Sequence, residues 1–163
     1  MKIFHGSKEI IEFPKILPSL TSSDFGTGFY TTPEYAQAVR WMHVAARNRT
    51  AGFISIFNFA LQDALDVGLQ VKTFTTPDEE FIRFVCKCHT DAYWEHGYDI
   101  VSGPLPDDRG YQDFTRFESG VFGEQELKKR LSKRDFSHQC LFHTTKALNL
   151  LKFVGFRRIR LTW

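Results

Sequence analysis

Three groups of residues have types and spacings that could do chemistry. His5, Gly6 and Ser7 end a short predicted strand, and the aromatic residues Tyr30 and Trp41 follow 25 and 36 residues after His5. Together they could form a ligand site. The loop carboxylates Asp107 and Asp108 could supply a charge or accept a proton. The run Cys86-Lys87-Cys88-His89 offers the atoms that metal ions bind.

The cysteine–histidine run does not predict a metal site. It lies on a predicted helix, residues 77–89, where positions i and i+2 point about 200° apart. Two such thiols cannot hold one ion, and no second ligand pair stands at zinc spacing. Cys140 has no partner that would make it a nucleophile. The sequence has neither a P-loop nor a G-x-G-x-x-G motif, so phosphate binding by those routes is excluded.

Four segments, taken in order, resemble known proteins. His5-Gly6-Ser7, then Gly28-Phe29-Tyr30-Thr31-Thr32, then Trp41 resemble the ADP-ribosyltransferases of the diphtheria-toxin type. Residues 24–31, 98–108 and 139–153, with Gln37 and Trp41, resemble a family of short bacterial proteins grouped with that fold. The resemblance spans nearly all 163 residues. It implies an NAD-dependent mono-ADP-ribosyltransferase, the toxin of a toxin–antitoxin pair, with NAD glycohydrolase activity as a variant of the same chemistry.

The resemblance also implies a role for each site residue. His5 would bind a hydroxyl of the adenosine ribose, and Gly6 would offer its N–H and C=O to the nicotinamide carboxamide. Tyr30 and Trp41 would stack on the cationic nicotinamide ring. Ser7 and Thr31 are expected to complete the NAD-binding residues, and His5 and Tyr30 are counted as catalytic too. NAD is the substrate, and no metal is expected.

The chain departs from the diphtheria-type pattern at the residue that supplies negative charge. Those enzymes carry a Glu on a late strand, whereas the predicted late strand here, residues 139–143, begins with Gln139 and has no Glu. An amide forms hydrogen bonds but is no general base. The candidates for the missing carboxylate are Asp107 and Asp108, and more weakly Asp24. His143 would share the strand face of Gln139, because side chains alternate with a period of two.

The elements that would position these residues alternate irregularly between strand and helix, which favours an α+β fold of the split-sheet ADP-ribosyltransferase type. Strands are predicted at residues 2–5, 29–31, 51–59, 98–103, 139–143 and 153–161, with one or two more within 64–74. Helices are predicted at 33–47, 77–89, 111–119, 124–131 and 146–150. Thr32, Thr76 and Thr144 are the expected N-caps. Residues 13–24 and 104–110 read as loops.

Length and composition fit a single domain, residues 1–163, that needs no disulfide or metal to fold. The 17 Phe predict a core filled with large rings. Three cysteines, no apolar run of membrane-spanning length and no signal peptide lead us to expect a reduced, cytoplasmic protein.

Charge is unevenly spread along the chain. Residues 128–163 carry ten Lys or Arg against Asp135, while the rest carries 11 basic and 18 acidic groups. A basic C-terminal end suits a polyanionic partner, although a solvated basic face has the same signature. The acceptor could therefore be protein or nucleic acid. The alternative to an enzyme is a non-catalytic module on the same fold that binds NAD, ADP-ribose or nucleic acid.

Overall fold

The computed structural model describes residues 1–18 and 23–162, which form seven strands and six helices in an α+β arrangement. In chain order these are β1 (Lys2–Ser7), β2 (Phe29–Thr31), α1 (Tyr35–Ala45), β3 (Ala51–Asn58), α2 (Leu61–Asp66), β4 (Val71–Thr73), α3 (Glu79–Thr90), β5 (Ile100–Leu105), α4 (Asp108–Glu118), α5 (Glu124–Leu131), β6 (Ser137–Phe142), α6 (Thr145–Leu148) and β7 (Lys152–Arg160). Residues 19–22 of the predicted loop, and Trp163 at the end of the predicted domain, lie outside the described residues.

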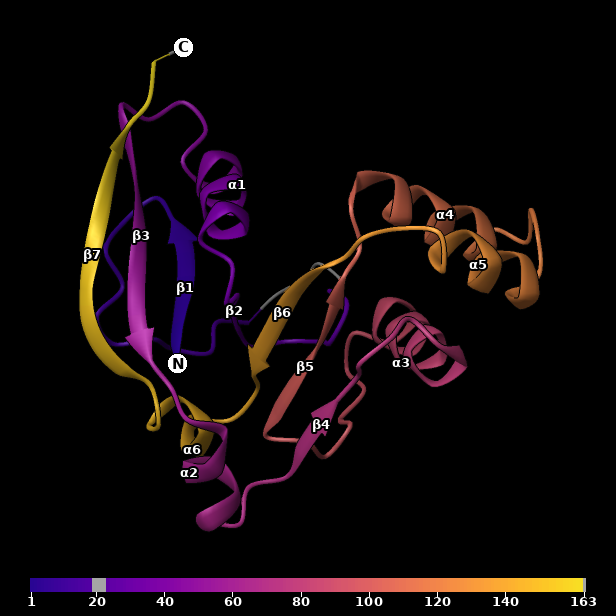
Figure 1. Cartoon of the computed structure of the whole chain (residues 1–163), viewed down its shortest axis with the longest axis horizontal. Helices are drawn as coiled ribbons and strands as arrows, with labels where there is room; N and C mark the ends of the chain where they lie inside the picture. The colour runs from indigo at the N-terminus through magenta and orange to yellow at the C-terminus, as the bar shows by residue number, and fades with distance from the viewer. Residues whose placement is uncertain (19–22, 163) are drawn as a thin grey trace.

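The strands form two sheets that meet at one point. The first is antiparallel, in the order β1-β3-β7, and the second is β2-β6-β5-β4, with β4 and β5 parallel. A bridge joins them: the Phe4 N–H donates to the Thr32 carbonyl at 2.8 Å, and the Thr32 N–H donates to the Phe4 carbonyl at 2.9 Å. Figure 1 shows the two sheets side by side, with β1 and β2 at their junction. The predicted α+β class with two sheets is confirmed.

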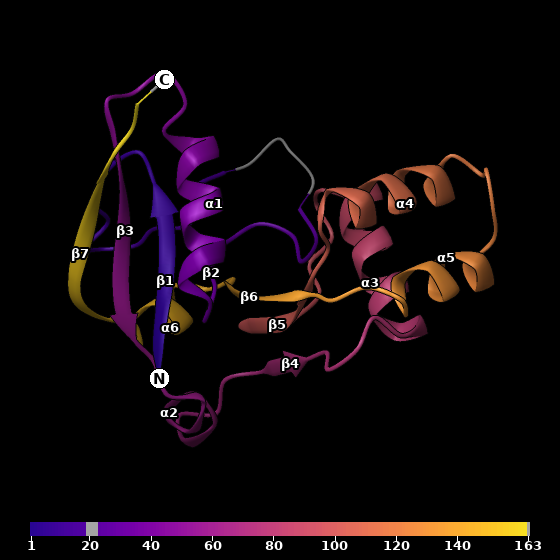
Figure 2. The ribbon, with the colours of Figure 1, turned by 45° about the horizontal axis from the view of Figure 1, so that its top comes forward.

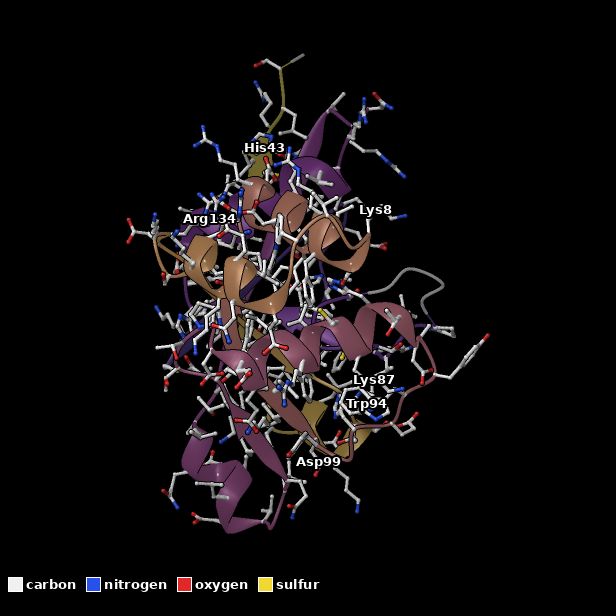
Figure 3. All side chains as sticks on the ribbon, turned by 90° about the vertical axis from the view of Figure 1, so that its right-hand side faces the viewer. Lys8, His43, Lys87, Trp94, Asp99 and Arg134 are labelled. Carbon is white, nitrogen blue, oxygen red and sulfur yellow. The ribbon has the colours of Figure 1, made fainter. Side chains whose placement is uncertain are left out.

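The helices cover the two sheets separately. Helix α1 packs on one face of β1 and β3 through Ala38, Met42 and Ile54, whereas α3, α4 and α5 gather at the far end of the four-stranded sheet (Figures 1 and 2). Figure 3 turns this helical end toward the viewer, with Lys87 of α3 and Arg134, which follows α5, labelled.

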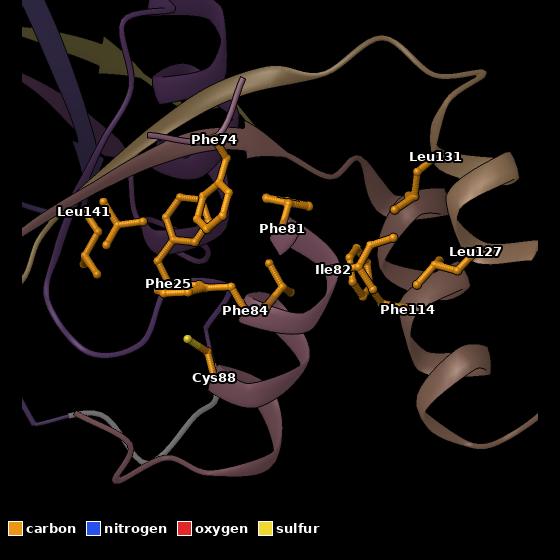
Figure 4. Packing of buried hydrophobic residues seen from close by; sticks show 12 residues of the cluster. Phe25, Phe74, Phe81, Ile82, Phe84, Cys88, Phe114, Leu127, Leu131 and Leu141 are labelled. Carbon is orange, nitrogen blue, oxygen red and sulfur yellow. The ribbon is translucent and has the colours of Figure 1, made fainter. Parts of the chain in front are cut away.

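Phenylalanine rings fill the core, as the composition predicted. Phe25, Phe57, Phe81, Phe114 and Phe142 are among the largest fully buried side chains. Figure 4 shows Phe25 beside Phe74, Phe81 and Phe84, where α3 packs against the four-stranded sheet.

Several predicted boundaries are wrong, and each has a local reason. Asp78, not Thr76, caps α3, because its side chain accepts the Phe81 N–H at 3.0 Å. The Thr32 hydroxyl donates to the His138 carbonyl, and Glu34 is the N-cap of α1. Thr144 caps α6, as predicted.

Two segments have a different structure from the one predicted. Most of the first half of the 64–74 region is helix α2 and its turn, which leaves only the three-residue strand β4. The loop predicted over residues 104–110 is also shorter in the structure than predicted. Pro104 and Leu105 end β5, and α4 begins at Asp108.

The basic C-terminal end is not one surface. Its residues divide between α5 with the turn after it and β7, which lie on opposite sides of the molecule (Figure 1). Arg130 and Arg134 also pair with the buried carboxylate of Asp113. No helix in the described part of the chain is long and apolar enough to cross a membrane.

Candidate functional site

A cavity of about 260 Å³ brings together residues from five separate elements, the fifth being β5, which supplies Leu105. Tyr30 comes from β2, Trp41 from α1, Tyr111 from α4 and Gln139 from β6. Ser23, Asp24 and Leu105 complete its lining. A second cavity, of about 410 Å³, shares Trp41, Leu105 and Tyr111 with the first. Three of the residues predicted to form one site, Tyr30, Trp41 and Gln139, therefore do line one cavity.

The Tyr30 hydroxyl forms two hydrogen bonds with the backbone, one as a donor and one as an acceptor. The hydroxyl donates to the Gly26 carbonyl at 2.8 Å and accepts the Phe25 N–H at 3.1 Å. Burial raises the pKa of Tyr30 strongly, and the nearby Asp24 carboxylate adds to the effect. The hydroxyl therefore stays protonated, and the aromatic ring is the part of Tyr30 that a ligand would meet.

His5 is tied directly to the backbone of Tyr30. Its Nδ1 lies 2.7 Å from the Tyr30 carbonyl oxygen. Because a carbonyl only accepts, Nδ1 carries the hydrogen and Nε2 is left as an acceptor. Burial lowers the pKa of His5, partly offset by this hydrogen bond, so the ring is neutral near pH 7. The ring stacks on Phe29 at 4.3 Å and, with Tyr30, lines a third cavity of about 320 Å³.

Asp24 is the buried carboxylate of the first cavity, with a side chain only 1% exposed. Its Oδ2 accepts Nε2–H of Gln139 at 2.8 Å and the Tyr111 hydroxyl at 3.0 Å. Its Oδ1 lies 3.0 Å from Nε2 of His89. Three donors from α3, α4 and β6 therefore converge on one carboxylate, the arrangement that a buried charge requires.

His89 lies between two carboxylates, because its Nδ1 is 2.7 Å from Oε1 of Glu118. Burial lowers the pKa of His89, but the hydrogen bonds and charges of Asp24 and Glu118 outweigh burial, and the net direction is upward. The imidazolium can donate to both carboxylates at once, whereas neutral imidazole has a single N–H.

The same carboxylates also raise the pKa values of two neighbouring thiols. Burial and the Asp24 carboxylate raise the pKa of Cys88 to about 12. Burial and Glu118 raise that of Cys86 to about 12. Both thiols are therefore protonated near pH 7, and the histidine of the run considered as a metal ligand binds carboxylates instead.

Gln139 is held with its amide in one orientation. Its Nε2 donates to Asp24 and also to the Pro104 carbonyl at 3.2 Å. Among the described residues, the buried side-chain atoms without a partner are Glu124 Oε1 and Arg134 Nε. Oε1 of Gln139 also has no donor in that part of the chain. It is absent from these buried atoms, so it is not fully buried. Since Gln139 lines the cavity, Oε1 is its free acceptor there.

Gly6 is needed first for packing. A Cβ at this position would lie 1.9 Å from the Ala38 carbonyl oxygen, so only glycine lets α1 approach β1 this closely. Phe4 directs its N–H and C=O to Thr32. Gly6, two residues further along, directs its own groups to the same side of the strand. No backbone partner for them on that side is found among residues 1–18 and 23–162.

The hydroxyls of Ser7 and Thr31 are used inside the fold. Ser7 donates to the Glu9 carbonyl at 2.6 Å. Thr31 is fully buried and donates to the Cys140 carbonyl at 3.2 Å, between β2 and β6. The side chain of Thr31 is therefore committed to the fold, and its place among the NAD-binding residues stays a prediction.

Asp107 and Asp108 are not among the described residues that line the cavity of Gln139. Asp107 caps α4 by accepting the Gly110 N–H at 2.7 Å. Asp107 and Asp108 both line the larger, 410 Å³ cavity. The carboxylate that meets Gln139 is Asp24, the weakest of the three sequence candidates.

His143 is not in the cavity of Gln139. Strand β6 ends at Phe142, and four residues of strand span about 13 Å. Nδ1 of His143 donates to the Thr27 carbonyl at 2.6 Å, and Nε2 lies 3.3 Å from Glu95. His143 is therefore a structural histidine with partners of its own, and although it follows Gln139 at even spacing, the separation along the strand keeps it out of that cavity.

Tyr111, His89 and Glu118 were missed as site residues. Tyr111 and His89 meet Asp24, and Glu118 meets His89, only because α3 and α4 come together near β6, and no short-range sequence pattern marks such a meeting. Asp24 itself carried a signal, since it begins the Asp24-Phe25-Gly26 run just before the turn into β2.

Fold and site together define an α+β protein with two sheets joined at β1 and β2 and a buried carboxylate–amide pair at a cavity. The chain belongs to the family described as "Protein of unknown function (DUF3990)", whose model matches residues 1–153. That match includes every residue of the cavity. Among curated proteins, none matches the chain.

Proposed function

We propose that the protein is an NAD-dependent mono-ADP-ribosyltransferase of the toxin type. The observation that carries the proposal is the 260 Å³ cavity in which two aromatic residues, Tyr30 and Trp41, lie with Gln139 and the Asp24 carboxylate. These are the residue types that a cationic ring on a ribose needs: rings to stack on and negative charge beside the sugar.

The reaction breaks the bond between the ribose carbon and the nicotinamide nitrogen of NAD. The bonding electrons go to nicotinamide, which leaves neutral and needs little help from a general acid. The sugar passes through an oxocarbenium-like transition state, as in glycoside hydrolysis. The attacking oxygen or nitrogen of the acceptor then bonds to the ribose and loses its proton to water. Positioning and charge stabilisation are therefore the main tasks of the protein.

The residues near β1 suit the other parts of NAD. Nε2 of neutral His5 is an acceptor for a ribose hydroxyl, because Nδ1 already donates to Tyr30. The N–H and C=O of Gly6 point to the side of β1 on which Phe4 bridges Thr32, just after the end of β2, and they suit the carboxamide of nicotinamide. Tyr30 lines both the cavity of His5 and that of Gln139, so one ligand could run along it from one cavity to the other.

The larger cavity is the proposed side of entry for the acceptor. It adjoins the first through Trp41 and Tyr111, and Asp108 lines it. A macromolecular acceptor, protein or nucleic acid, would bring its nucleophile here. In a toxin–antitoxin pair, a cognate antitoxin protein would cover the same opening. The proposal includes no metal.

The proposal is tested by incubating the purified protein with labelled NAD and cell lysate, and by following nicotinamide release and label transfer together. His5→Ala and Gln139→Ala are compared with His43→Ala, a control on the exposed surface of α1. We expect release and transfer in the wild type and in His43→Ala, and loss in the other two. Nuclease or protease treatment of the labelled product identifies the acceptor class. NAD binding without release or transfer contradicts the transferase and leaves the binding module.

A further inference from the structure

We infer that Asp24 acts through Gln139. The carboxylate fixes the amide so that Oε1 accepts a hydrogen bond from a ribose hydroxyl of NAD, and it supplies the negative charge that an amide lacks. His89 and Glu118 are positioning residues that hold this carboxylate in place. The inference rests on the proposed function and names a carboxylate that sequence resemblance did not assign.

The first step is the orientation of the amide. A glutamine can present either its oxygen or its NH₂ to a ligand, and the hydrogen-bond network decides which. Here Nε2 faces two acceptors, Asp24 Oδ2 and the Pro104 carbonyl. Reversing the amide would place its oxygen against both of them. The pair therefore commits Oε1 to accept, which is the role that a carboxylate would have in this position.

The second step is charge. An anion bonded to the NH₂ of an amide polarises it and increases the negative charge on its oxygen, an effect that is stronger in a poorly solvated site. Asp24, His89 and Glu118 together hold two carboxylates and one imidazolium, so the network keeps one excess negative charge. Tyr111, Cys88 and Tyr30, which also lie near Asp24, have raised pKa values and stay neutral. The excess charge lies directly behind the cavity where positive charge would develop on ribose.

The third step is the fixing of the carboxylate itself. His89 reaches Asp24 from α3, and Glu118 reaches His89 from α4. The His89 ring also packs against Phe114 at 6.0 Å. Both oxygens of Asp24 therefore have hydrogen-bond partners, Oδ1 with His89 and Oδ2 with Gln139 and Tyr111. The proton of the attacking group leaves to water.

The test exchanges the two side-chain types. Gln139→Glu alone puts two carboxylates against each other, and Asp24→Asn alone removes the charge. We expect each to lower kcat for nicotinamide release about 100-fold, the scale of losing one charge-stabilising group, with KM changed less than about threefold. The double variant Asp24→Asn/Gln139→Glu restores one carboxylate and one amide and should recover at least about tenfold over either single variant. Asp63→Asn on the distant helix α2 is the matched control.

His89→Gln tests the positioning role. It keeps a donor toward Asp24 but cannot be an imidazolium. We expect the kcat of the wild type to fall at alkaline pH, as His89 loses the proton that lets it donate to both Asp24 and Glu118, and this fall to be absent in His89→Gln. A purely structural role for His89 would change stability but would not remove that limb of the pH profile.

Two readouts separate this inference from the proposed function. A wild type without nicotinamide release contradicts the proposed function itself. In the absence of NAD, ¹⁵N NMR of the wild type should show His89 as an imidazolium above pH 6.5. In Asp24→Asn the imidazolium signal should be lost at that pH, and the amide hydrogens of Gln139 should exchange faster. Wild-type turnover in Asp24→Asn overturns the inference. So does a double variant no more active than Gln139→Glu when thermal melts show that both are folded.

Discussion

Nδ1 of His5 donates to the backbone carbonyl of Tyr30 at 2.7 Å, across the gap between the two sheets. The two sheets are otherwise joined here by the Phe4–Thr32 bridge. One imidazole therefore sets the position of the Tyr30 backbone and presents its own Nε2 as an acceptor. This coupling links the geometry of the ring-binding cavity to the residue proposed to hold ribose.

His5→Ala should weaken NAD binding. The substitution removes the Nε2 acceptor and leaves the Tyr30 carbonyl without its donor, which costs about 1–3 kcal/mol, or roughly 5- to 150-fold in affinity if the whole loss falls on binding. Isothermal titration calorimetry with NAD measures the change. His43 is exposed on helix α1, so His43→Ala should bind NAD like the wild type. Equal Kd values for wild type and His5→Ala would contradict the proposed role.

Trp41 should report binding of the nicotinamide ring. Stacking of an electron-poor ring on an indole quenches its fluorescence, and Trp41 lines the 260 Å³ cavity. We expect NAD to quench tryptophan emission in the wild type and in Trp94→Phe, because Trp94 packs on Phe84 at the α3 end. The quench should disappear in Trp41→Phe, whereas binding measured by calorimetry should fall only a few-fold. Quenching that survives Trp41→Phe would mean that the ring binds elsewhere.

The parts of the fold governed by local chemistry were predictable. The strand β2, the helix α5 and the Thr144 cap of α6 lie where alternation, charge pattern and capping residues indicated. The resemblance placed Tyr30, Trp41 and Gln139 in one site, and all three do line one cavity. Each of these predictions rests on the residues of a short segment, or on the order in which short segments follow one another along the chain.

The parts that depend on packing between distant elements were not predictable. His89 lay in a run that suggested metal ligands, and only the packing of α3 against α4 and β6 brings it to Asp24 and Glu118. Gly6 was predicted to contact the nicotinamide carboxamide, but the nearest neighbour of a Cβ added there is the backbone of α1. Thr76 was the predicted cap of α3, but the side chain that reaches the Phe81 N–H is that of Asp78.

Gly6→Ala should destabilise the fold. The added Cβ would lie 1.9 Å from the Ala38 carbonyl oxygen and 2.7 Å from the Met42 nitrogen, both backbone atoms that a rotamer change cannot move. Overpacking costs about 1–3 kcal/mol where side chains can yield, so we expect at least about 3 kcal/mol here. Urea unfolding gives the free energy. Gly123→Ala, where an added Cβ meets nothing within 4 Å, should cost less than about 1 kcal/mol.

The His89 network should give stability that depends on pH with a defined sign. The pKa of His89 is raised in the folded protein by Asp24 and Glu118, against the opposing effect of burial. The folded state therefore binds the His89 proton more tightly than the unfolded state does. The stabilisation is complete below the unfolded pKa of about 6.5 and is lost as pH rises through the higher folded value.

Urea unfolding of wild type and His89→Gln at a series of pH values measures this contribution. The difference in unfolding free energy between them should be largest between about pH 5 and pH 6.5, and it should shrink as pH rises further, because the wild type then loses the imidazolium. Asp24→Asn should flatten the same pH dependence, since it removes one of the two anions that hold the proton. A difference that grows with pH would show that His89 is neutral in the folded protein and that its contacts with Asp24 and Glu118 are not ion pairs.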